Sequence, residues 1–170
     1  MDELKYWHAV FTASRAEKKV RDRLEELGVE CFLPVQTVLR QWTYRKSRVV
    51  VPVIAGLVFV RVGRQEQVKV LQTKGVVAFL RLKGEAGAAV IPDKQMEDFR
   101  FLLDFSEEAV EMTNENIKAG DLVRVVKGSL RGMEGELIRH KGVTKVLVRI
   151  DMLGCAMVSI PASFVEKLNK

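Results

Sequence analysis

The stretch IKAGDLVRVVKGSLRGMEGELIRHK, residues 117–141, decides the fold of the last third of the chain. Short runs of alternating apolar residues are separated by turns that carry glycine, which is typical of a small β-barrel. In a barrel of about 50 residues, strands bend sharply and backbones approach closely, so glycine supplies a positive φ or the room that a side chain would fill. The later runs KVLVRI and MVSIP continue the pattern. We therefore expect an all-β module over residues 117–170.

The start of the chain predicts a strand and then a helix. LKYWHAVFTA, residues 4–13, is largely apolar on both alternating faces, which indicates a central strand. SRAEKKVRDRLEELG follows, in which Ser14 and Glu17 have the spacing of a capping box and Gly28 marks the end of the helix. The spacing predicts a buried stripe formed by Ala16, Val20, Leu24 and Leu27.

A basic hairpin is predicted in the extended region that follows. RQWTYRKSR, residues 40–48, sets Trp42 and Tyr44 among cations, and no acidic residue occurs from position 31 to position 65. Cations neutralise phosphates and aromatic rings stack on unpaired bases, so this composition favours a loop that binds a single strand of nucleic acid. A hairpin tip that only keeps the protein in solution is the alternative interpretation.

The remaining elements complete an α+β domain. A short helix is expected near residues 65–72, a strand at VVAFLRL, and a helix at IPDKQMEDFRFLLDF with Pro92 at its start. SEEAVEMTNEN, residues 106–116, is acidic and aperiodic and predicts a linker. The expected architecture is a mainly antiparallel sheet flanked by helices over residues 1–105, the linker 106–116, and the small β-barrel 117–170.

Composition narrows the function classes. The net charge is +6, and residues 112–170 hold 10 Lys and Arg against 6 Asp and Glu, which favours a nucleic-acid or acidic protein partner. No apolar run is long enough for a membrane helix and the N-terminus does not resemble a secretory signal, so a cytoplasmic location is expected.

The reactive residue types predict no catalytic or metal chemistry. Cys31 and Cys155 lie far apart without CxxC spacing, so neither a disulfide framework nor a zinc site is expected. His8 falls in the first strand and His140 in a basic turn, with no serine or cysteine partner indicated for either. We expect neither an enzyme nor a bound metal or cofactor.

The order of elements resembles the NusG family of bacterial transcription elongation factors from end to end. AGDLVRVVKG, continuing to Gly142, resembles the KOW motif, and an N-terminal domain, a linker and a KOW module in this order are more specific than that motif alone. The supporting N-terminal residues are Trp7-His8, Glu17, Val20, Phe32-Leu33-Pro34, Gly56-Leu57-Val58-Phe59-Val60 and Thr73-Lys74-Gly75-Val76.

Two departures from the family pattern favour a specialised paralogue. Ala55-Gly56-Leu57 stands where many members have Pro-Gly-Tyr, and Leu153 and Cys155 replace an aromatic and a basic residue near the last barrel turn. Together with the basic hairpin, these differences are similar to the RfaH or UpxY type, whose members are antiterminators of particular operons. A general housekeeping NusG and a ribosome-associated KOW protein that binds RNA are the alternatives.

The resemblance implies a monomer that binds RNA polymerase and suppresses pausing. Its apolar surface would contact the β′ clamp helices and reach towards the β subunit, and the candidates, each of which could also be a core residue, are Phe11, Leu57, Phe59, Met96 and Phe99. Contacts with non-template DNA are implied for Arg15, Lys19, Arg23, Thr73 and Lys74, and the hairpin composition adds Arg45, Lys46 and Arg48. The KOW module would bind a small-subunit ribosomal protein or Rho through Leu130, Met133, Met152 and Leu153.

Overall fold

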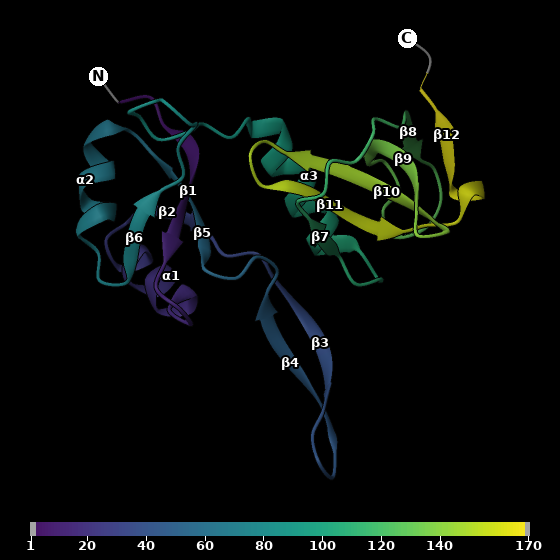
Figure 1. Ribbon diagram of the computed structural model, residues 1–170, viewed down its shortest axis with the longest axis horizontal. Helices are drawn as coiled ribbons and strands as arrows, with labels where there is room; N and C mark the ends of the chain where they lie inside the picture. The colour runs from purple at the N-terminus through teal and green to yellow at the C-terminus, as the bar shows by residue number, and fades with distance from the viewer. Residues whose placement is uncertain (1–2, 169–170) are drawn as a thin grey trace. The chain divides into compact units, whose positions relative to one another are not determined.

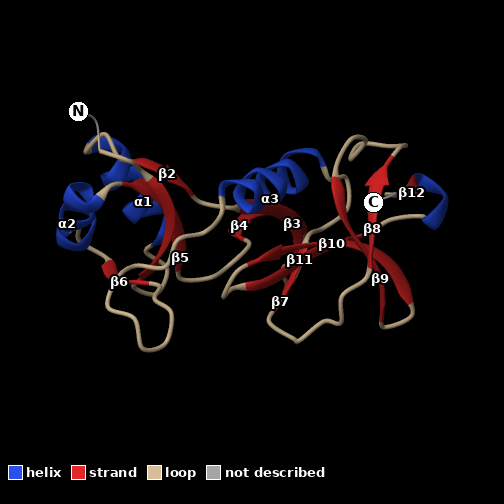
Figure 2. Cartoon of the chain, turned by 90° about the horizontal axis from the view of Figure 1, so that it is seen from above, coloured by secondary structure: helices blue, strands red, loops and turns tan. Residues whose placement is uncertain are grey.

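The computed structural model of the protein describes residues 3–168 and has the expected α+β fold class (Figures 1 and 2). Contacts divide the chain into two compact units. Unit 1 consists of Met1–Val35 and Ile54–Asp93, and unit 2 consists of Gln36–Val53 and Lys94–Lys170. The domain boundaries expected after residues 105 and 116 stay a prediction.

Unit 1 is a four-stranded antiparallel sheet with two helices. The sheet order is β2-β5-β1-β6, so β1 is a central strand as predicted. Its elements are β1 (Tyr6–Thr12), α1 (Glu17–Glu26), β2 (Glu30–Phe32), β5 (Leu57–Val62), α2 (Arg64–Gln72) and β6 (Val76–Phe79). The core forms where Val20 and Leu24 of α1 pack with the buried valines of β1 and β5, because these two residues share one helical face.

The start and end of α1 differ from the sequence-based expectation. The helix begins at Glu17, and Ala16 at its N-cap position makes no side-chain capping bond, so the predicted capping box is wrong. Instead, the buried Glu17 carboxylate accepts a hydrogen bond from the backbone N–H of Gly56, at 3.3 Å. Leu27 follows the last helical residue and is exposed, so it lies outside the buried stripe.

Unit 2 contains a two-stranded hairpin, a helix and a six-stranded antiparallel sheet. The sheet order is β12-β8-β9-β10-β11-β7, and we call β7 to β12 the barrel module. The hairpin is β3 (Val35–Gln41) and β4 (Lys46–Pro52), and the helix is α3 (Asp93–Phe105). The barrel module comprises β7 (Glu111–Thr113), β8 (Asp121–Val125), β9 (Glu134–His140), β10 (Val143–Ile150), β11 (Gly154–Ser159), the 3-10 turn η1 (Ala162–Phe164) and β12 (Val165–Lys167).

A strand lies within the stretch that sequence periodicity predicted as a linker. β7 pairs antiparallel with β11, with Thr113 opposite Cys155. Three residues are too few to show an alternating pattern, and a strand edge supplies backbone partners that the local sequence does not encode. Pairing of this kind is a tertiary property and could not be read from SEEAVEMTNEN.

An arginine fork fixes the entry to the barrel module. Arg149 donates from Nε to Glu136 Oε2 at 2.6 Å and from Nη2 to Glu136 Oε1 at 3.1 Å, and Nη2 also donates to the Ile117 carbonyl at 2.8 Å. The Gly120 N–H donates to the same carboxylate at 3.0 Å. Burial raises the pKa of Glu136, but the hydrogen bonds from Arg149 and Gly120 outweigh it and hold this pKa below its ordinary value.

We predict that Glu136→Gln destabilises the protein near neutral pH and that the difference from wild type shrinks in acid. A carboxyl whose pKa is lowered by folding stabilises the fold above its unfolded pKa, near 4.5, and loses that contribution as the pH falls through the folded value. Urea denaturation followed by circular dichroism at several pH values measures this. A difference that stays constant down to pH 3 would contradict the ionic role.

Glycine has two different tasks in the barrel module. At Gly120 a Cβ would lie 2.2 Å from the Leu137 carbonyl oxygen, so the close approach of two backbones requires glycine. At Gly132 the φ of +95° requires it, while the space around a Cβ is open.

We predict that Gly120→Ala destabilises the fold more than Gly132→Ala does. In Gly132→Ala only the left-handed backbone conformation disfavours the new side chain, and this destabilises the fold by about 1–2 kcal/mol. The Gly120 variant must displace a strand carbonyl, which costs about 1–3 kcal/mol or more and breaks the approach to Glu136. Chemical denaturation of both variants is the measurement, and equal losses would mean that the backbone approach is not tight.

Candidate functional site

The C-terminal end of β1 joins three segments of unit 1. The backbone N–H of Thr12 donates to the Gly56 carbonyl at 2.9 Å, and that of Ala13 donates to the Gly75 carbonyl at 2.8 Å. These bonds form because β1 lies between β5 and β6 in the sheet. The start of α1, the turn before β5 and the turn before β6 therefore meet, and each carries residues predicted to bind nucleic acid or polymerase.

Arg15, Lys19 and Arg23, which are implied to contact DNA, do not all lie on α1. Arg15 precedes the helix, with a φ of +60°, so only Lys19 and Arg23 lie one turn apart on α1. Lys19 is exposed. Arg23 donates from Nη1 to the carbonyl of Lys74 at 2.8 Å, and this bond brings the turn after α2 against the helix.

A cavity of about 350 Å³ lies beside this contact. The Thr73 hydroxyl is not free to meet a ligand there, because the residue is buried and donates to the Lys69 carbonyl at 2.8 Å, ending α2. Lys69 itself adds a cation that sequence reasoning missed, since no pattern separates it from other surface lysines. The lining residues are Arg23, Glu26, Leu27, Lys69, Gln72 and Thr73. We call Lys19, Arg23, Lys69 and Lys74 the basic cluster.

The predicted basic hairpin is present and belongs to unit 2. β3 and β4 pair with each other, and Arg45, Lys46 and Arg48 are all exposed. At its base, the Gln36 side chain donates to the Val110 carbonyl at 3.1 Å and accepts from the Val110 N–H at 3.0 Å. The base is therefore held to the segment that leads into β7. We call β3, β4 and their loop the hairpin arm.

The apolar candidates of unit 1 differ in burial. Phe11 is 40% exposed and pairs across β1 and β5 with Leu57, which is buried. Phe59 is fully buried and stacks against Phe32 with ring centroids 6.2 Å apart. Phe11 is thus the candidate whose ring reaches the surface, while Leu57 and Phe59 support the sheet behind it.

The apolar candidates of α3, Met96 and Phe99, belong to unit 2, and both are buried. Next to them, the Gln95 side chain donates to Asp151 Oδ1 at 2.9 Å and accepts from the Asp151 N–H at 2.8 Å. Asp151 follows β10, so α3 is tied to a turn of the barrel module. In this arrangement the two side chains are interior residues.

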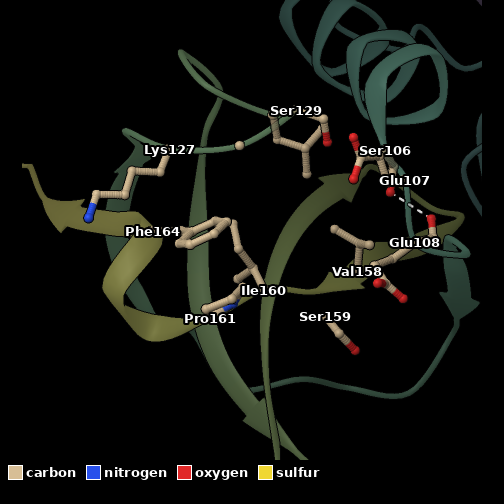
Figure 3. Close-up of a pocket in the computed structure, with 12 residues that line it drawn as sticks. Ser106, Glu107, Glu108, Lys127, Ser129, Val158, Ser159, Ile160, Pro161 and Phe164 are labelled. Carbon is tan, nitrogen blue, oxygen red and sulfur yellow. Dashed lines mark hydrogen bonds between the residues drawn. The ribbon is translucent and has the colours of Figure 1, made fainter.

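The barrel candidates also divide into exposed and buried residues. Leu130 and Met133 are buried, whereas Met152 is 39% exposed at a φ of +69° and Leu153 is half-buried. Leu130 belongs to a cavity of about 220 Å³ in unit 2 (Figure 3). Other residues of its lining include Lys127, Ser129, Val158, Ile160, Pro161 and Phe164. Met152 and Leu153 therefore form the accessible part of the predicted contact patch.

The described residues offer little reactive chemistry. Within residues 3–168 there is no group of three His, Cys, Asp or Glu side chains that could hold a metal ion. Burial, as the larger cause, and the negative charge of nearby Glu25, as the smaller one, together raise the pKa of Cys31 to about 11. This thiol therefore stays protonated near neutral pH. Over the same described range, no helix has the length and apolar character needed to cross a membrane.

Comparison with known proteins assigns the family. Residues 5–100 match the family model described as transcription termination factor nusG. The chain belongs to the NusG family. A structure of NusG from Thermotoga maritima that describes its domain interaction is 23% identical, covers 97% of this chain and 98% of its own, and has a TM-score of 0.52. A structure of the MjSpt4:Spt5 complex in conformation B is 17% identical, covers 96% of this chain and 97% of its own, and has a TM-score of 0.31.

No curated protein matches the sequence. The family assignment therefore rests on the family model, and the Thermotoga NusG adds a likeness of fold. NusG-family proteins are transcription elongation factors that bind RNA polymerase and are not enzymes. The six-stranded barrel module fits the KOW domain that follows the N-terminal domain in this family.

We predict that neutralising Lys19 and Lys69 together lowers the salt dependence of binding to an elongation complex. Each lost phosphate contact reduces the slope of log K against log salt by about 0.7 for single-stranded DNA. Stability should change by less than about 0.5 kcal/mol, since both are surface cations. Binding titrations at several salt concentrations compare this double Gln variant with Lys83→Gln, an exposed lysine of unit 1 outside the cluster. An unchanged slope would mean that Lys19 and Lys69 do not contact the phosphates of the DNA.

Proposed function

We propose that this NusG-family protein binds RNA polymerase at the β′ clamp helices, reaches towards the β subunit, and suppresses pausing and termination. The observation that carries the proposal is the meeting of exposed Phe11 and the Gly56-Leu57 turn at the end of β1, inside the segment that matches the family model. An aromatic ring exposed beside a buried supporting side chain is suited to an apolar contact. No covalent chemistry is needed for this activity.

The five apolar candidates would not contribute in the same way. Phe11 can touch a partner directly, and Leu57 and Phe59 would hold the strand that presents it. Met96 and Phe99 would become contacts only if their side chains were uncovered, because both are buried. Burying the Phe11 ring against an apolar partner would supply roughly 1–2 kcal/mol of the binding free energy.

The cations support a second contact, with the non-template strand of the transcription bubble. In unit 1, the hydrogen bond from Arg23 to Lys74 gathers the basic cluster, and Arg15 lies in the turn that opens α1. Thr73 would act by fixing the backbone of the turn after α2, because its hydroxyl already donates a hydrogen bond to the Lys69 carbonyl. In unit 2, the exposed Arg45, Lys46 and Arg48 would bind further phosphates. Several such contacts make binding strongly dependent on salt.

The barrel module would recruit a further factor. Met152 and Leu153 are accessible apolar side chains in a turn, where polar residues are usual, and they suit a small apolar contact with a ribosomal protein of the small subunit or with Rho. Leu130 and Met133 would support this patch from inside.

We further propose a specialised antiterminator of the RfaH or UpxY type, acting in the cytoplasm as a monomer. Its support is the Ala55-Gly56-Leu57 turn and the basic hairpin arm. Action at one operon rather than genome-wide would separate it from a general NusG. Cosedimentation with ribosomal subunits but not with polymerase would instead favour the RNA-binding KOW alternative.

We predict that Phe11→Asp weakens polymerase binding by tenfold or more while the fold persists. A carboxylate in an apolar contact loses its hydration without gaining a partner. Phe11 is preferable to Leu57 for this test, because Leu57 is buried and Leu57→Asp would place an unpaired charge in the protein interior. Tyr6→Asp is the matched control, an exposed aromatic of β1 whose side chain points to the opposite face of the sheet.

The readouts are affinity for purified core polymerase and pause lifetimes on a defined template. Circular dichroism and melting must match wild type for both variants. If Phe11→Asp and the wild type bind polymerase with equal affinity, Phe11 is not part of the polymerase contact. A wild-type protein that binds polymerase without changing pause lifetimes would contradict the anti-pausing role.

A further inference from the structure

The hairpin arm ends in a very short loop. The backbone N–H of Trp42 donates to the Arg45 carbonyl at 2.7 Å, which leaves only Thr43 and Tyr44 between the paired positions. β3 has seven residues, and a strand of that length spans roughly 20 Å at about 3.3 Å per residue. Because Gln36 holds the base, the arm presents its tip well away from its attachment (Figure 1).

The two aromatic residues of the arm have different surroundings. Tyr44 is 97% exposed, so its ring has almost no support from the protein. Trp42 is 48% exposed, and its indole Nε1–H donates to the Ser47 hydroxyl across the hairpin. Trp42 is therefore held in place, whereas the ring of Tyr44 is available on both faces. A large apolar ring left open at a loop tip indicates an interaction site.

The charges of the arm specify an anionic partner. Arg45, Lys46 and Arg48 flank the loop, and the nearest acidic residues in the sequence are at positions 30 and 66. In the described part of the chain, none of these three cations forms an ion pair. The cations are thus uncompensated and free to bind phosphates.

Unpaired nucleic acid matches both features of the tip. An acidic protein surface would satisfy the cations but would offer no regular flat partner for Tyr44. In a duplex, the faces of the bases are covered by stacking, and a two-stranded ribbon would read the groove through the side chains along its length rather than through its tip. In a single strand each base has an open face beside its phosphate, which is the arrangement that proteins bind with an aromatic ring and neighbouring cations.

We propose that Tyr44 stacks on an unpaired base while Arg45, Lys46 and Arg48 bind the adjoining phosphates, and that Trp42 positions the loop through Ser47. The inference rests on the proposed function, because a transcribing polymerase supplies the unpaired non-template strand. It adds a base-stacking residue to the phosphate contacts of the arm. It also assigns different roles to two aromatics that look equivalent in the sequence.

Intrinsic fluorescence offers a direct test in the full chain. The chain contains two tryptophans, and Trp7 is buried in unit 1, so Trp7→Phe leaves Trp42 beside the tip as the reporter. In this background, Tyr44→Phe keeps a ring and Tyr44→Leu keeps only apolar bulk. The probes are an oligothymidine and a mixed-sequence duplex of equal length, titrated at low salt and followed by Trp42 emission and by anisotropy of a labelled probe.

We expect Tyr44→Phe to bind the single strand within about twofold of the parent and Tyr44→Leu to bind about fivefold or more weakly. Lys46→Gln should reduce the slope of log K against log salt by about 0.7, whether position 44 carries Phe or Leu. The Tyr44→Phe and Tyr44→Leu variants should bind the duplex with equal affinity. Equal binding of the single strand by the two Tyr44 variants, or an equal loss on duplex, would overturn the stacking role.

A second measurement separates this inference from the proposed function. A photoreactive phenylalanine at position 44 should crosslink to the non-template strand of a reconstituted elongation complex. If the wild type binds that complex but the tip crosslinks only to protein, the stacking inference fails and the proposed function stands. If the wild type does not bind polymerase while Tyr44→Leu still weakens single-strand binding, the proposed function fails and the tip remains a nucleic-acid site.

Discussion

The pairing of β1 on both sides is the constraint on which the candidate surface of unit 1 depends. A strand bonded to β5 and β6 must end where the turns that precede those two strands are found, and the N–H groups of Thr12 and Ala13 bond to their glycine carbonyls. The first helix starts from the same point. Residues from three distant parts of the sequence are thereby fixed to one end of the sheet, and the bonds from Gly56 to the Glu17 carboxylate and from Arg23 to the Lys74 carbonyl add to this backbone pairing.

In unit 2, side chains that bond to the backbone of other segments connect the elements. The amide of Gln36 holds Val110, the amide of Gln95 holds Asp151, and the guanidinium of Arg149 holds Ile117 while it forks onto Glu136. Each bond satisfies polar groups at a place where regular pairing ends. They link the hairpin arm, which is distant in sequence, with α3 and the barrel module into one compact unit.

Burial distinguishes residues that can meet a partner from residues that support them. Phe11 and Leu57 are neighbours across two strands, yet only the phenylalanine reaches solvent. The same division separates Met152 from Met133 in the barrel module. A surface charge at Phe11 or Met152 therefore tests binding, whereas a charge at Leu57 or Met133 tests folding.

The sequence by itself determined the elements whose signals are local. A run that is apolar on both faces predicted β1, alternation predicted the barrel strands, helical spacing predicted α1, and the composition of residues 40–48 predicted a basic hairpin. The α+β class and the family resemblance followed from their order. These features depend on side-chain periodicity and turn chemistry, which are properties of neighbouring residues.

Only the tertiary structure decided which residues meet and which remain exposed. It replaced the expected capping box with a bond from Gly56 to Glu17, placed β7 on the edge of β11, and brought Lys69 beside Arg23. It also left Tyr44 open while fixing Trp42, although both looked alike in the sequence. Such outcomes depend on hydrogen-bond partners and packing supplied by segments far away in the chain, and periodicity carries no information about those partners.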